Sequence, residues 1–300
     1  MKTADRMKTA TTDVLEIAFE QWGPDDGAPV VLLHGFPYDV RAFDEVAPIL
    51  ADAGHRVIAP YLRGFGPTRF LADDTPRSGQ QAAIAADLID LLDALDIDRA
   101  VLAGFDWGGR AACIVAALRP ERVTGLVTVD GYTVQHIASA DEPAPPAWEA
   151  TYWYQYYFHG ERGRLGLERN RDELCELLWR NWSPTWNFTP ETFAASAPSL
   201  HNPDFVDVVI HSYRHRFGLV EGDPRYDALE AALAEAPPII VPTIVLETGA
   251  DGVLGGPVDD DRDHFVGPYG QERLDGVGHN VPQQAPREFA RAILDLATGS

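Results

Sequence analysis

The sequence predicts an α/β protein in which a mostly parallel, doubly wound sheet is interrupted by one long helical insertion. Over residues 1–131, short apolar runs alternate with segments whose apolar residues recur at helical spacing. This alternation stops at residues 132–238, which are rich in proline and aromatic residues and show no clear strand pattern. It resumes over residues 239–300. We therefore expect a core domain formed by 1–131 with 239–300, and a helical cap domain formed by 132–238.

The strand predictions rest on the pattern of apolar residues. Residues 14–22 alternate between apolar and polar side chains, which is typical of an edge strand. Residues 30–35 form a continuous apolar run that ends in glycine, as buried parallel strands do. Further strands are expected at 56–62, 100–105, 123–130, 241–249 and 271–277. Residues 1–13 nearly repeat M-K-T-A, and we assign this start of the chain no function.

Helices are expected between these strands. Helical spacing predicts them at 41–53, at 82–95, directly after the strand 100–105, and at 287–296. In the helix 82–95, the apolar residues occupy one face. We therefore expect Asp87, Asp90 and Asp93 to face solvent.

Composition and charge narrow the class of function. With 45% hydrophobic and 23% charged residues, the composition is that of a globular protein, and no apolar run approaches the roughly 20 residues that span a membrane. A formal charge of -22 argues against nucleic acid and anionic membranes as partners. It also disfavours small anionic substrates, unless a local pocket overrides it. Cys113 and Cys175 give no disulfide framework, so we expect a cytoplasmic protein.

The stretch G-F-D-W-G-G at 104–109 carries the strongest chemical signal. It follows a predicted strand and precedes a predicted helix, which is the setting of a nucleophile elbow. The usual central residue of an elbow is serine, but here it is Asp106. A carboxylate at a helix N-terminus is also a common cap, so the stretch alone leaves a structural role open.

Two later residues favour a catalytic role for Asp106. Asp251 follows the predicted strand 241–249, and His279 follows the predicted strand 271–277. Because the carboxyl ends of parallel strands meet at one edge of a sheet, we expect both side chains to lie beside the elbow. Asp130, which ends an earlier strand, is an alternative acid for the same histidine.

A further motif, H-G-F-P at 34–37, directly follows a predicted strand. Its backbone is expected to turn across the same sheet edge. We expect the backbone N–H groups of Phe36 and Trp107 to form an oxyanion hole beside Asp106.

Together, H-G-F-P, G-F-D-W-G-G and G-V-G-H-N (276–280) resemble the epoxide hydrolase and haloalkane dehalogenase branch of the α/β-hydrolase fold, over nearly the whole chain. The resemblance implies a helical cap inserted after the sixth strand. It implies that Asp106 attacks carbon to give an alkyl-enzyme ester, which a water activated by His279 then hydrolyses. It favours Asp251 as the acid, because epoxide hydrolases use the strand before it. No cofactor and no metal is implied.

The cap segments Y-Q-Y-Y-F (154–158) and S-Y-R (212–214) are similar to those of epoxide hydrolases, in which two tyrosines donate hydrogen bonds to the ring oxygen. The resemblance gives this role to Tyr154 and Tyr213, and it implies an epoxide opened to a vicinal diol. Aromatic packing of the cap is the structural alternative for both. We expect a small apolar or aromatic substrate. Its pocket is expected to contain His34, Phe36, Trp107, Trp153, Trp182 and Trp186.

A haloalkane or haloacid dehalogenase with the same aspartate is the alternative function. Trp107 could hold a halide through its indole N–H, but Phe36 stands where many haloalkane dehalogenases have asparagine. Arg110 matches one arginine of fluoroacetate dehalogenases, whereas Trp107 stands where that group has another. One arginine is a poor clamp for a carboxylate, so the epoxide interpretation is favoured.

Other histidines and arginines give weaker indications of function. His211 and His215 could share a metal on one helix face, but no third ligand is evident, so we expect no metal site. Arg214 and Arg216 are expected to pair with acidic residues around the cap. The sequence indicates no nucleic-acid or membrane partner, and it leaves a homodimer open.

Overall fold

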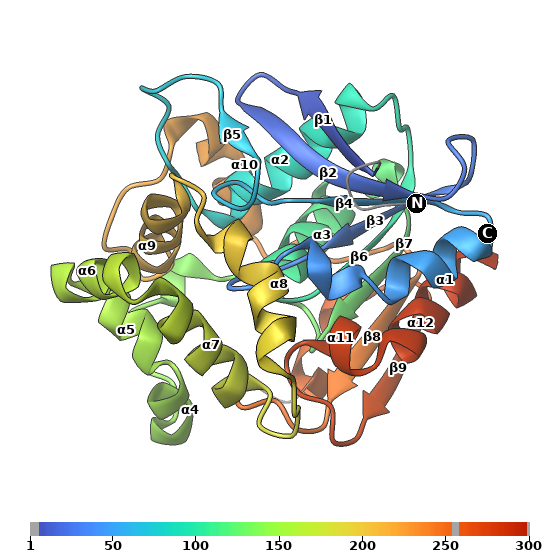
Figure 1. The fold of residues 1–300 in the computed structure, drawn as a ribbon. Coiled ribbons are helices and arrows are strands. Elements are labelled where there is room, and N and C mark those ends of the chain that lie inside the picture. The colour runs from blue at the N-terminus through green and yellow to red at the C-terminus, as the bar shows by residue number, and fades with distance from the viewer. Residues whose placement is uncertain (1–5, 254–257, 299–300) are drawn as a thin grey trace.

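The computed structural model describes residues 6–253 and 258–298, and its centre is one large sheet (Figure 1). The neighbours within this sheet are ordered β1-β2-β4-β3-β6-β7-β8-β9, and the short β5 pairs with β2 off this path. β1 and β2 pair antiparallel, as do β2 and β4, whereas all pairs from β4 to β9 are parallel. The strands are β1 (Met7–Thr11), β2 (Leu15–Trp22), β3 (Pro29–Leu33), β4 (Arg56–Pro60), β5 (Arg69–Phe70), β6 (Ala100–Gly104), β7 (Val123–Val129), β8 (Thr243–Thr248) and β9 (Tyr269–Leu274).

Each predicted strand is present, but the prediction that residues 14–22 form an edge strand is wrong. β2 alternates in sequence, yet it is covered by β1, whose Met7 pairs with Glu20 and whose Thr11 pairs with Glu16. The start of the chain, to which we assigned no function, thus supplies the outer strand of the sheet. Its residues 1–5 lie outside the described residues.

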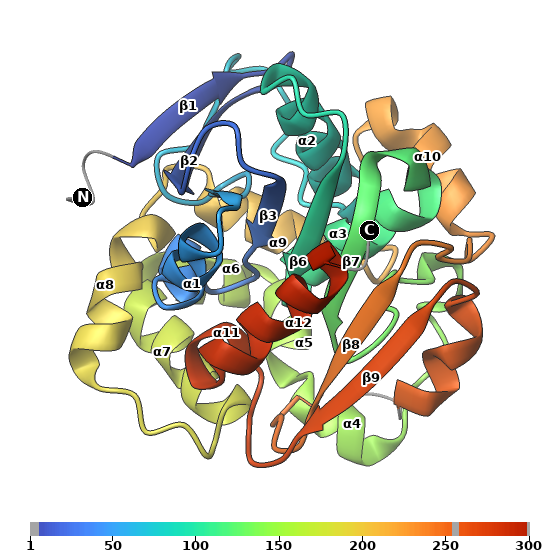
Figure 2. The ribbon, with the colours of Figure 1, turned by 90° about the vertical axis from the view of Figure 1, so that its right-hand side faces the viewer.

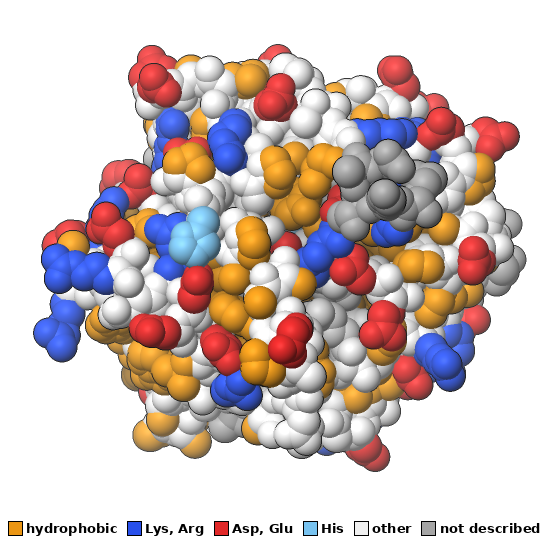
Figure 3. All heavy atoms as spheres, viewed as in Figure 1, with side chains coloured by type: hydrophobic (Ala, Val, Ile, Leu, Met, Phe, Trp, Pro, Cys, Tyr) orange, Lys and Arg blue, Asp and Glu red, His pale blue; other side chains and the backbone are white. Residues whose placement is uncertain are grey.

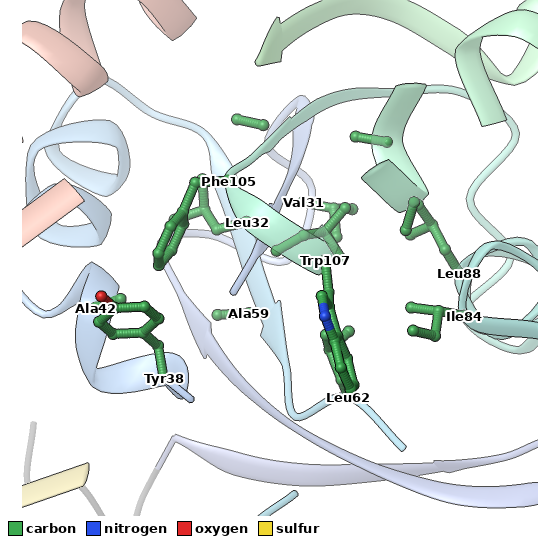
Figure 4. Packing of buried hydrophobic residues seen from close by; sticks show 14 of the residues in the cluster. Val31, Leu32, Tyr38, Ala42, Ala59, Leu62, Ile84, Leu88, Phe105 and Trp107 are labelled. Carbon is green, nitrogen blue, oxygen red and sulfur yellow. The ribbon is translucent and has the colours of Figure 1, made fainter. Parts of the chain in front are cut away.

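Helices cover both faces of the sheet. α2 (Gln81–Ala94) and α3 (Asp106–Leu118) lie on one face, and α1 (Val46–Asp52) and α12 (Pro286–Thr298) lie together on the other (Figure 2). The predicted helix 41–53 begins as a 3-10 turn at Val40–Phe43 before α1. Because β3, β4 and β6 are enclosed between helices, their apolar runs are buried. Figure 4 shows part of this core, with Val31, Leu32, Ala59, Ile84 and Leu88.

The segment 132–238 is helical, and no strand lies within it. Its helices are α4 (Pro146–Thr151), α5 (Trp153–His159), α6 (Glu161–Arg169), α7 (Arg171–Trp182), α8 (Pro190–Leu200), α9 (Phe205–His215) and α10 (Asp227–Leu233). α4 to α9 gather at one end of the sheet, whereas α10 packs beside α2 of the core (Figure 1). β7 is the sixth strand in chain order once β5 is set aside, so the helical segment follows the sixth strand. The boundary at 238 stays a prediction.

Acidic side chains are scattered over the face seen in Figure 3, among hydrophobic and basic ones. None of the described helices combines the length and the apolar character needed to cross a membrane.

Asp87 does not face solvent, contrary to the expectation from helical spacing. It is 7% exposed and binds Arg63 through two hydrogen bonds of 2.6 Å, one to each carboxylate oxygen. Arg63 also donates to the Ser78 carbonyl at 2.9 Å and to the Tyr226 hydroxyl at 3.1 Å. Arg63 lies after β4, and the spacing of apolar residues within one helix cannot predict a contact with a residue outside that helix.

We predict that Asp87→Ala lowers the free energy of unfolding by about 3–5 kcal/mol, because it leaves the buried Arg63 guanidinium without its counter-charge. Urea denaturation measures the loss. The double variant Arg63→Met/Asp87→Leu should recover much of it, since both charges are then removed. As a control, Arg119→Ala breaks an exposed ion pair with Glu121 and should have a far smaller effect. Equal losses in Asp87→Ala and Arg119→Ala would contradict the prediction.

A second buried carboxylate, Asp39, joins the core to the helical segment. Ser196 and Ser199 of α8 each donate a hydroxyl hydrogen bond of 2.6 Å to it, and the Arg41 N–H donates at 3.1 Å. Burial raises the pKa of Asp39 to about 7, although these hydrogen bonds oppose the shift. Between about pH 4 and pH 7, the folded protein therefore binds a proton that the unfolded chain has lost.

Asp39 should thus make the protein less stable as pH rises through that window, because its raised pKa favours the protonated folded state. Asp39→Asn removes this contribution. The free energy of unfolding of the variant, relative to the wild type, should rise by up to about 1.4 kcal/mol per pH unit. Urea denaturation at a series of pH values from 4 to about 7 tests this. Parallel stability curves for the two proteins would show that Asp39 does not titrate as expected.

Candidate active site

Three ionisable side chains meet at the carboxyl edge of the sheet, where the sequence places them. Asp106 is the first residue of α3, directly after β6. Asp251 lies in the loop after β8, and His279 lies in the loop between β9 and the short helix α11 (Val281–Gln284). Because β6, β8 and β9 run in the same direction, their following loops converge on one edge.

The elbow conformation of Asp106 depends on glycines around it. Asp106 has a φ of 52°, in the left-handed region that non-glycine residues rarely adopt. A Cβ on Gly35 would lie 2.3 Å from the Asp106 side chain, and a Cβ on Gly108 would lie 2.2 Å from the Leu33 carbonyl oxygen. Glycine at both positions therefore lets α3 approach β3 closely enough to hold Asp106 in this conformation.

His279 is oriented by Asp251. Its Nδ1 lies 2.7 Å from Asp251 Oδ2, and its Nε2 lies 3.5 Å from Asp106 Oδ2. The alternative acid, Asp130, is engaged elsewhere, since its two oxygens accept from the Thr248 N–H and the Thr248 hydroxyl, both at 2.7 Å. In this geometry Asp251 contacts Nδ1 of His279, and Nε2 faces Asp106.

The two N–H groups expected in the oxyanion hole point at the Asp106 carboxylate. The Phe36 N–H donates to Oδ1 at 2.7 Å, and the Trp107 N–H also hydrogen-bonds to this carboxylate. Oδ1 is therefore held by the Phe36 N–H, whereas Oδ2 faces His279. The two carboxylate oxygens of Asp106 thus have different surroundings.

Opposite charges at short range set the protonation states. Burial alone lowers the pKa of His279, but the carboxylates of Asp251 and Asp106 outweigh it, so this pKa lies well above its ordinary value. Burial alone raises the pKa of Asp106, but the hydrogen bond and charge of His279 keep it below its ordinary value. The resting site therefore pairs an ionised Asp106 with a protonated His279.

Tyr154 of α5 and Tyr213 of α9 lie side by side above this edge of the sheet. They are 4% and 1% exposed, and their ring centroids are 5.4 Å apart in an edge-to-face arrangement. The Tyr154 hydroxyl accepts from Gln155 Nε2 at 3.0 Å. Burial raises the pKa of both phenols. Both therefore remain neutral hydrogen-bond donors at physiological pH.

A cavity of about 930 Å³ opens onto these groups. Asp106, Tyr154, Trp182, Asp251 and His279 all line it. Charged and amide side chains line it as well, so it is more polar than the apolar pocket that we expected: Arg110, Gln135, Glu149, Gln155 and Arg216.

The other residues expected in the pocket lie outside this lining. Phe36 and Trp107 stack behind it with ring centroids 5.7 Å apart, and Tyr213 packs against both. Trp153 is 37% exposed, and Trp186 stacks on another cap tryptophan.

His34, also expected in the pocket, is fully buried behind the oxyanion loop. Its Nε2 accepts from the Leu62 N–H at 3.1 Å, and its Nδ1 lies 3.0 Å from the Gly35 carbonyl oxygen. Both ring nitrogens are thus used in bracing backbone. This geometry supports a structural role in holding the H-G-F-P turn.

The structure brings two residues to the cavity that the sequence analysis gave no catalytic role. Arg110 follows Asp106 by one turn of α3, a spacing that could have identified it. Arg216 was expected to pair with an acid, yet no described carboxylate forms an ion pair with it, whereas Arg214 pairs with Glu161 at 3.0 Å.

The two histidines with metal-ligand spacing lie away from this site. His211 Nδ1 accepts from the Gly79 N–H at 3.1 Å, and its Nε2 lies 3.1 Å from the Glu221 carbonyl oxygen. Its ring stacks on that of His215, with centroids 5.6 Å apart. Among the described residues, no group of three or more metal-ligating side chains is present.

Comparison with known proteins gives matches along nearly the whole chain. A family model described as the alpha/beta hydrolase fold matches residues 28–198. An epoxide hydrolase of Caballeronia sordidicola is 41% identical over 292 residues, which cover 89% of this chain and 87% of that protein. Epoxide hydrolase A of Mycobacterium tuberculosis is 28% identical over 306 residues, covering 92% of each. A crystal structure of "a putative epoxide hydrolase" from Klebsiella pneumoniae subsp. pneumoniae MGH 78578 matches with a TM-score of 0.97 and 45% identity, over 99% of this chain and 98% of that chain.

The charge of Asp106 should control the base strength of His279. We predict that Asp106→Asn lowers the pKa of His279 by about one pH unit or more, because one of its two neighbouring carboxylates is lost. NMR titration of the histidine ring signals measures this, with the His279 signal assigned from its loss in His279→Gln. Glu272→Gln serves as a control, since Glu272 pairs with Arg291 at the surface. An unchanged pKa in Asp106→Asn would show that Asp106 does not set the protonation of the base.

Proposed function

This chain belongs to the alpha/beta hydrolase fold family, and on that premise we propose that it is an epoxide hydrolase that works through a covalent ester on Asp106. The observation that carries the proposal is the combination at one sheet edge of an elbow carboxylate, a His–Asp pair and two buried phenols. The relatives described as epoxide hydrolases, at up to 45% identity among those compared above, support the same reaction. The product is a vicinal diol.

In the first step, Asp106 Oδ2 attacks one epoxide carbon from the cavity. The C–O bond of the ring breaks, and the released oxygen takes a proton from Tyr154 or Tyr213. Oδ1 remains bound by the Phe36 and Trp107 N–H groups and becomes the carbonyl oxygen of the ester. Phenols with raised pKa values suit this step, since they donate without being ionised in the resting enzyme.

In the second step, His279 first gives its proton to the phenolate that ring opening leaves, and its Nε2 then removes a proton from water, which attacks the carbonyl carbon of the ester. The Phe36 and Trp107 N–H groups stabilise the negative charge that develops on the carbonyl oxygen. Collapse of the intermediate expels the diol oxygen, which takes its proton from His279. The new carboxyl group of Asp106 ionises, and its proton returns to His279. One epoxide and one water are consumed, and one diol is formed.

A dehalogenase with the same nucleophile is the second candidate. The observation that favours it is the Trp107 indole N–H, which is buried and has no hydrogen-bond partner among the described residues. Neither Trp107 nor Tyr213 lines the cavity, whereas Tyr154 does. The paired phenols have no task in halide release, so the epoxide reaction accounts for more of the site.

The aromatic part of the cavity wall supports a substrate with an apolar or aromatic body. Trp148, Tyr152, Tyr154 and Trp182 line it from the helical segment, and their rings would exclude water from the reacting carbon. We further propose a cytoplasmic location and a small-molecule substrate, with no nucleic-acid or membrane partner. The two cysteines support a reducing compartment, because both are buried free thiols.

The decisive test uses His279→Phe, which lacks the base for the second step. We predict that this variant, mixed with epoxides and haloalkanes, gains the mass of one whole epoxide, and that the adduct maps to Asp106 by peptide mass spectrometry. The ester should accumulate because nothing activates water to cleave it. The wild type should show turnover to diol and no lasting adduct.

Two further variants make this test specific. Asp106→Asn/His279→Phe should gain no mass, because it lacks the attacking carboxylate. Tyr154→Phe/Tyr213→Phe should lose epoxide opening by at least about a hundredfold. An adduct equal to a haloalkane without its halide, unaffected by the tyrosine changes, would instead identify a dehalogenase. Absence of any adduct on Asp106 would reject the covalent mechanism for these substrates.

A further inference from the structure

Two cavity arginines have no task in the proposed reaction. Arg110 lies on α3 four residues after Asp106, and Arg216 caps α9 three residues after Tyr213. Both line the cavity that opens onto the nucleophile. Side chains three or four residues apart lie on the same side of a helix. Each arginine is therefore fixed about one helical turn from a group that takes part in ring opening.

Neither guanidinium is neutralised by the protein. Arg110 Nε donates to the Thr133 carbonyl at 2.9 Å, and Arg216 Nη1 donates to Gln155 Oε1 at 3.3 Å. The Arg216 guanidinium also lies 4.8 Å from the centroid of the Tyr213 ring. These partners are uncharged. Among the side chains that the structure describes, which leave out residues 254–260, no ion pair joins either arginine to a carboxylate.

Placing two uncompensated cations together has an electrostatic cost. Burial, together with the charge of Arg216, lowers the pKa of Arg110 to about 10, while Asp106 opposes the shift. The chain carries 46 acidic residues against 24 Lys and Arg, so carboxylates are plentiful. The absence of a carboxylate beside these two arginines therefore favours a binding role for them. An anion that is not part of the protein would stabilise both guanidinium groups.

Most of the acidic side chains that line the same cavity are already engaged by the protein. They and their partners are Asp251 with His279, Asp130 with Thr248, Glu149 with the Ala144 N–H, and Glu247 with Arg273. Arg110 and Arg216 thus keep guanidinium groups that no described carboxylate pairs with, although carboxylates held only by neutral donors, such as Asp130 and Glu149, also line the cavity. A carboxylate that binds both guanidinium groups directly would offset the general expectation that the charge of -22 disfavours anionic substrates.

We propose that Arg110 and Arg216 bind an anionic group of the substrate, so that the enzyme acts on epoxides that carry a carboxylate. This inference rests on the proposed function and names its substrate class. The aromatic wall receives the apolar body, and the arginine pair receives the carboxylate through charge-assisted hydrogen bonds. Helical spacing places each arginine one turn from Asp106 or Tyr213, so the carboxylate would lie a few carbon atoms from the epoxide ring.

The test compares 6,7-epoxyheptanoate with 6,7-epoxyheptanamide, a neutral analogue of nearly the same shape. The wild type should hydrolyse the carboxylate with a kcat/KM at least about tenfold higher than that of the amide. Arg110→Gln and Arg216→Gln should each lower kcat/KM for the carboxylate by about tenfold to a hundredfold, mainly by raising KM. Their losses on the amide should be much smaller. Arg110→Lys should keep part of the preference, because it keeps the charge.

Matched controls remove an arginine without touching the cavity. Arg119→Gln at the end of α3 and Arg214→Gln on α9 should leave the ratio of the two kcat/KM values unchanged, since both arginines pair with glutamates. Equal hydrolysis of acid and amide by the wild type would overturn the inference, as would equal losses on both probes in the arginine variants. If neither probe forms diol and His279→Phe gains no adduct from any epoxide, the proposed function itself fails, and this inference fails with it.

Discussion

The close packing of three backbone segments around the elbow is the constraint on which this site depends. A Cβ on Gly104 would lie 2.7 Å from the Gly108 carbonyl carbon, and a Cβ on Gly108 would meet the Leu33 carbonyl oxygen at 2.2 Å. α3 therefore begins against β3 and β6 at a separation that only glycine allows. Asp106 is left with a positive φ, and its carboxylate reaches the Phe36 N–H. His279 and the cap tyrosines are then arranged around a carboxylate that has little freedom to move.

The negative charge of the buried carboxylates is partly balanced by basic side chains from distant parts of the chain. Two carboxylates, Asp106 and Asp251, flank one imidazolium, so the buried row carries one excess negative charge. Arg110 lowers the pKa of Asp106 across the cavity and offsets part of that excess. The same guanidinium keeps donors that no described carboxylate occupies. Arg110 therefore acts on Asp106 through its charge, and under the proposal above the arginine pair would gain further stabilisation when a substrate carboxylate binds.

The sequence predicted the fold because each strand ends in a recognisable motif and parallel topology brings those ends together. The meeting of Asp106, Asp251 and His279 at one edge of the sheet could be predicted in this way without knowledge of the cap. The residues that line the cavity could not be predicted, because the lining depends on how helices far apart in the sequence pack together. His34 was expected in the pocket and instead braces the oxyanion turn. Asp87 was expected in solvent and instead binds the buried Arg63, since a partner outside the helix overrides the periodicity of the helix itself.

Under the proposed mechanism, an aspartate at the elbow does something that a serine could not. Attack by a serine hydroxyl on an epoxide carbon would leave an ether, which has no carbonyl for water to attack. Attack by Asp106 leaves an ester whose carbonyl oxygen already lies at the Phe36 N–H. Ester formation also removes one of the two negative charges that hold the pKa of His279 high. The histidine becomes easier to deprotonate once the ester exists, so the first step prepares the base for the second. Under this mechanism, esterification of Asp106 thus creates the carbonyl that water attacks and also lowers the pKa of the histidine that activates this water.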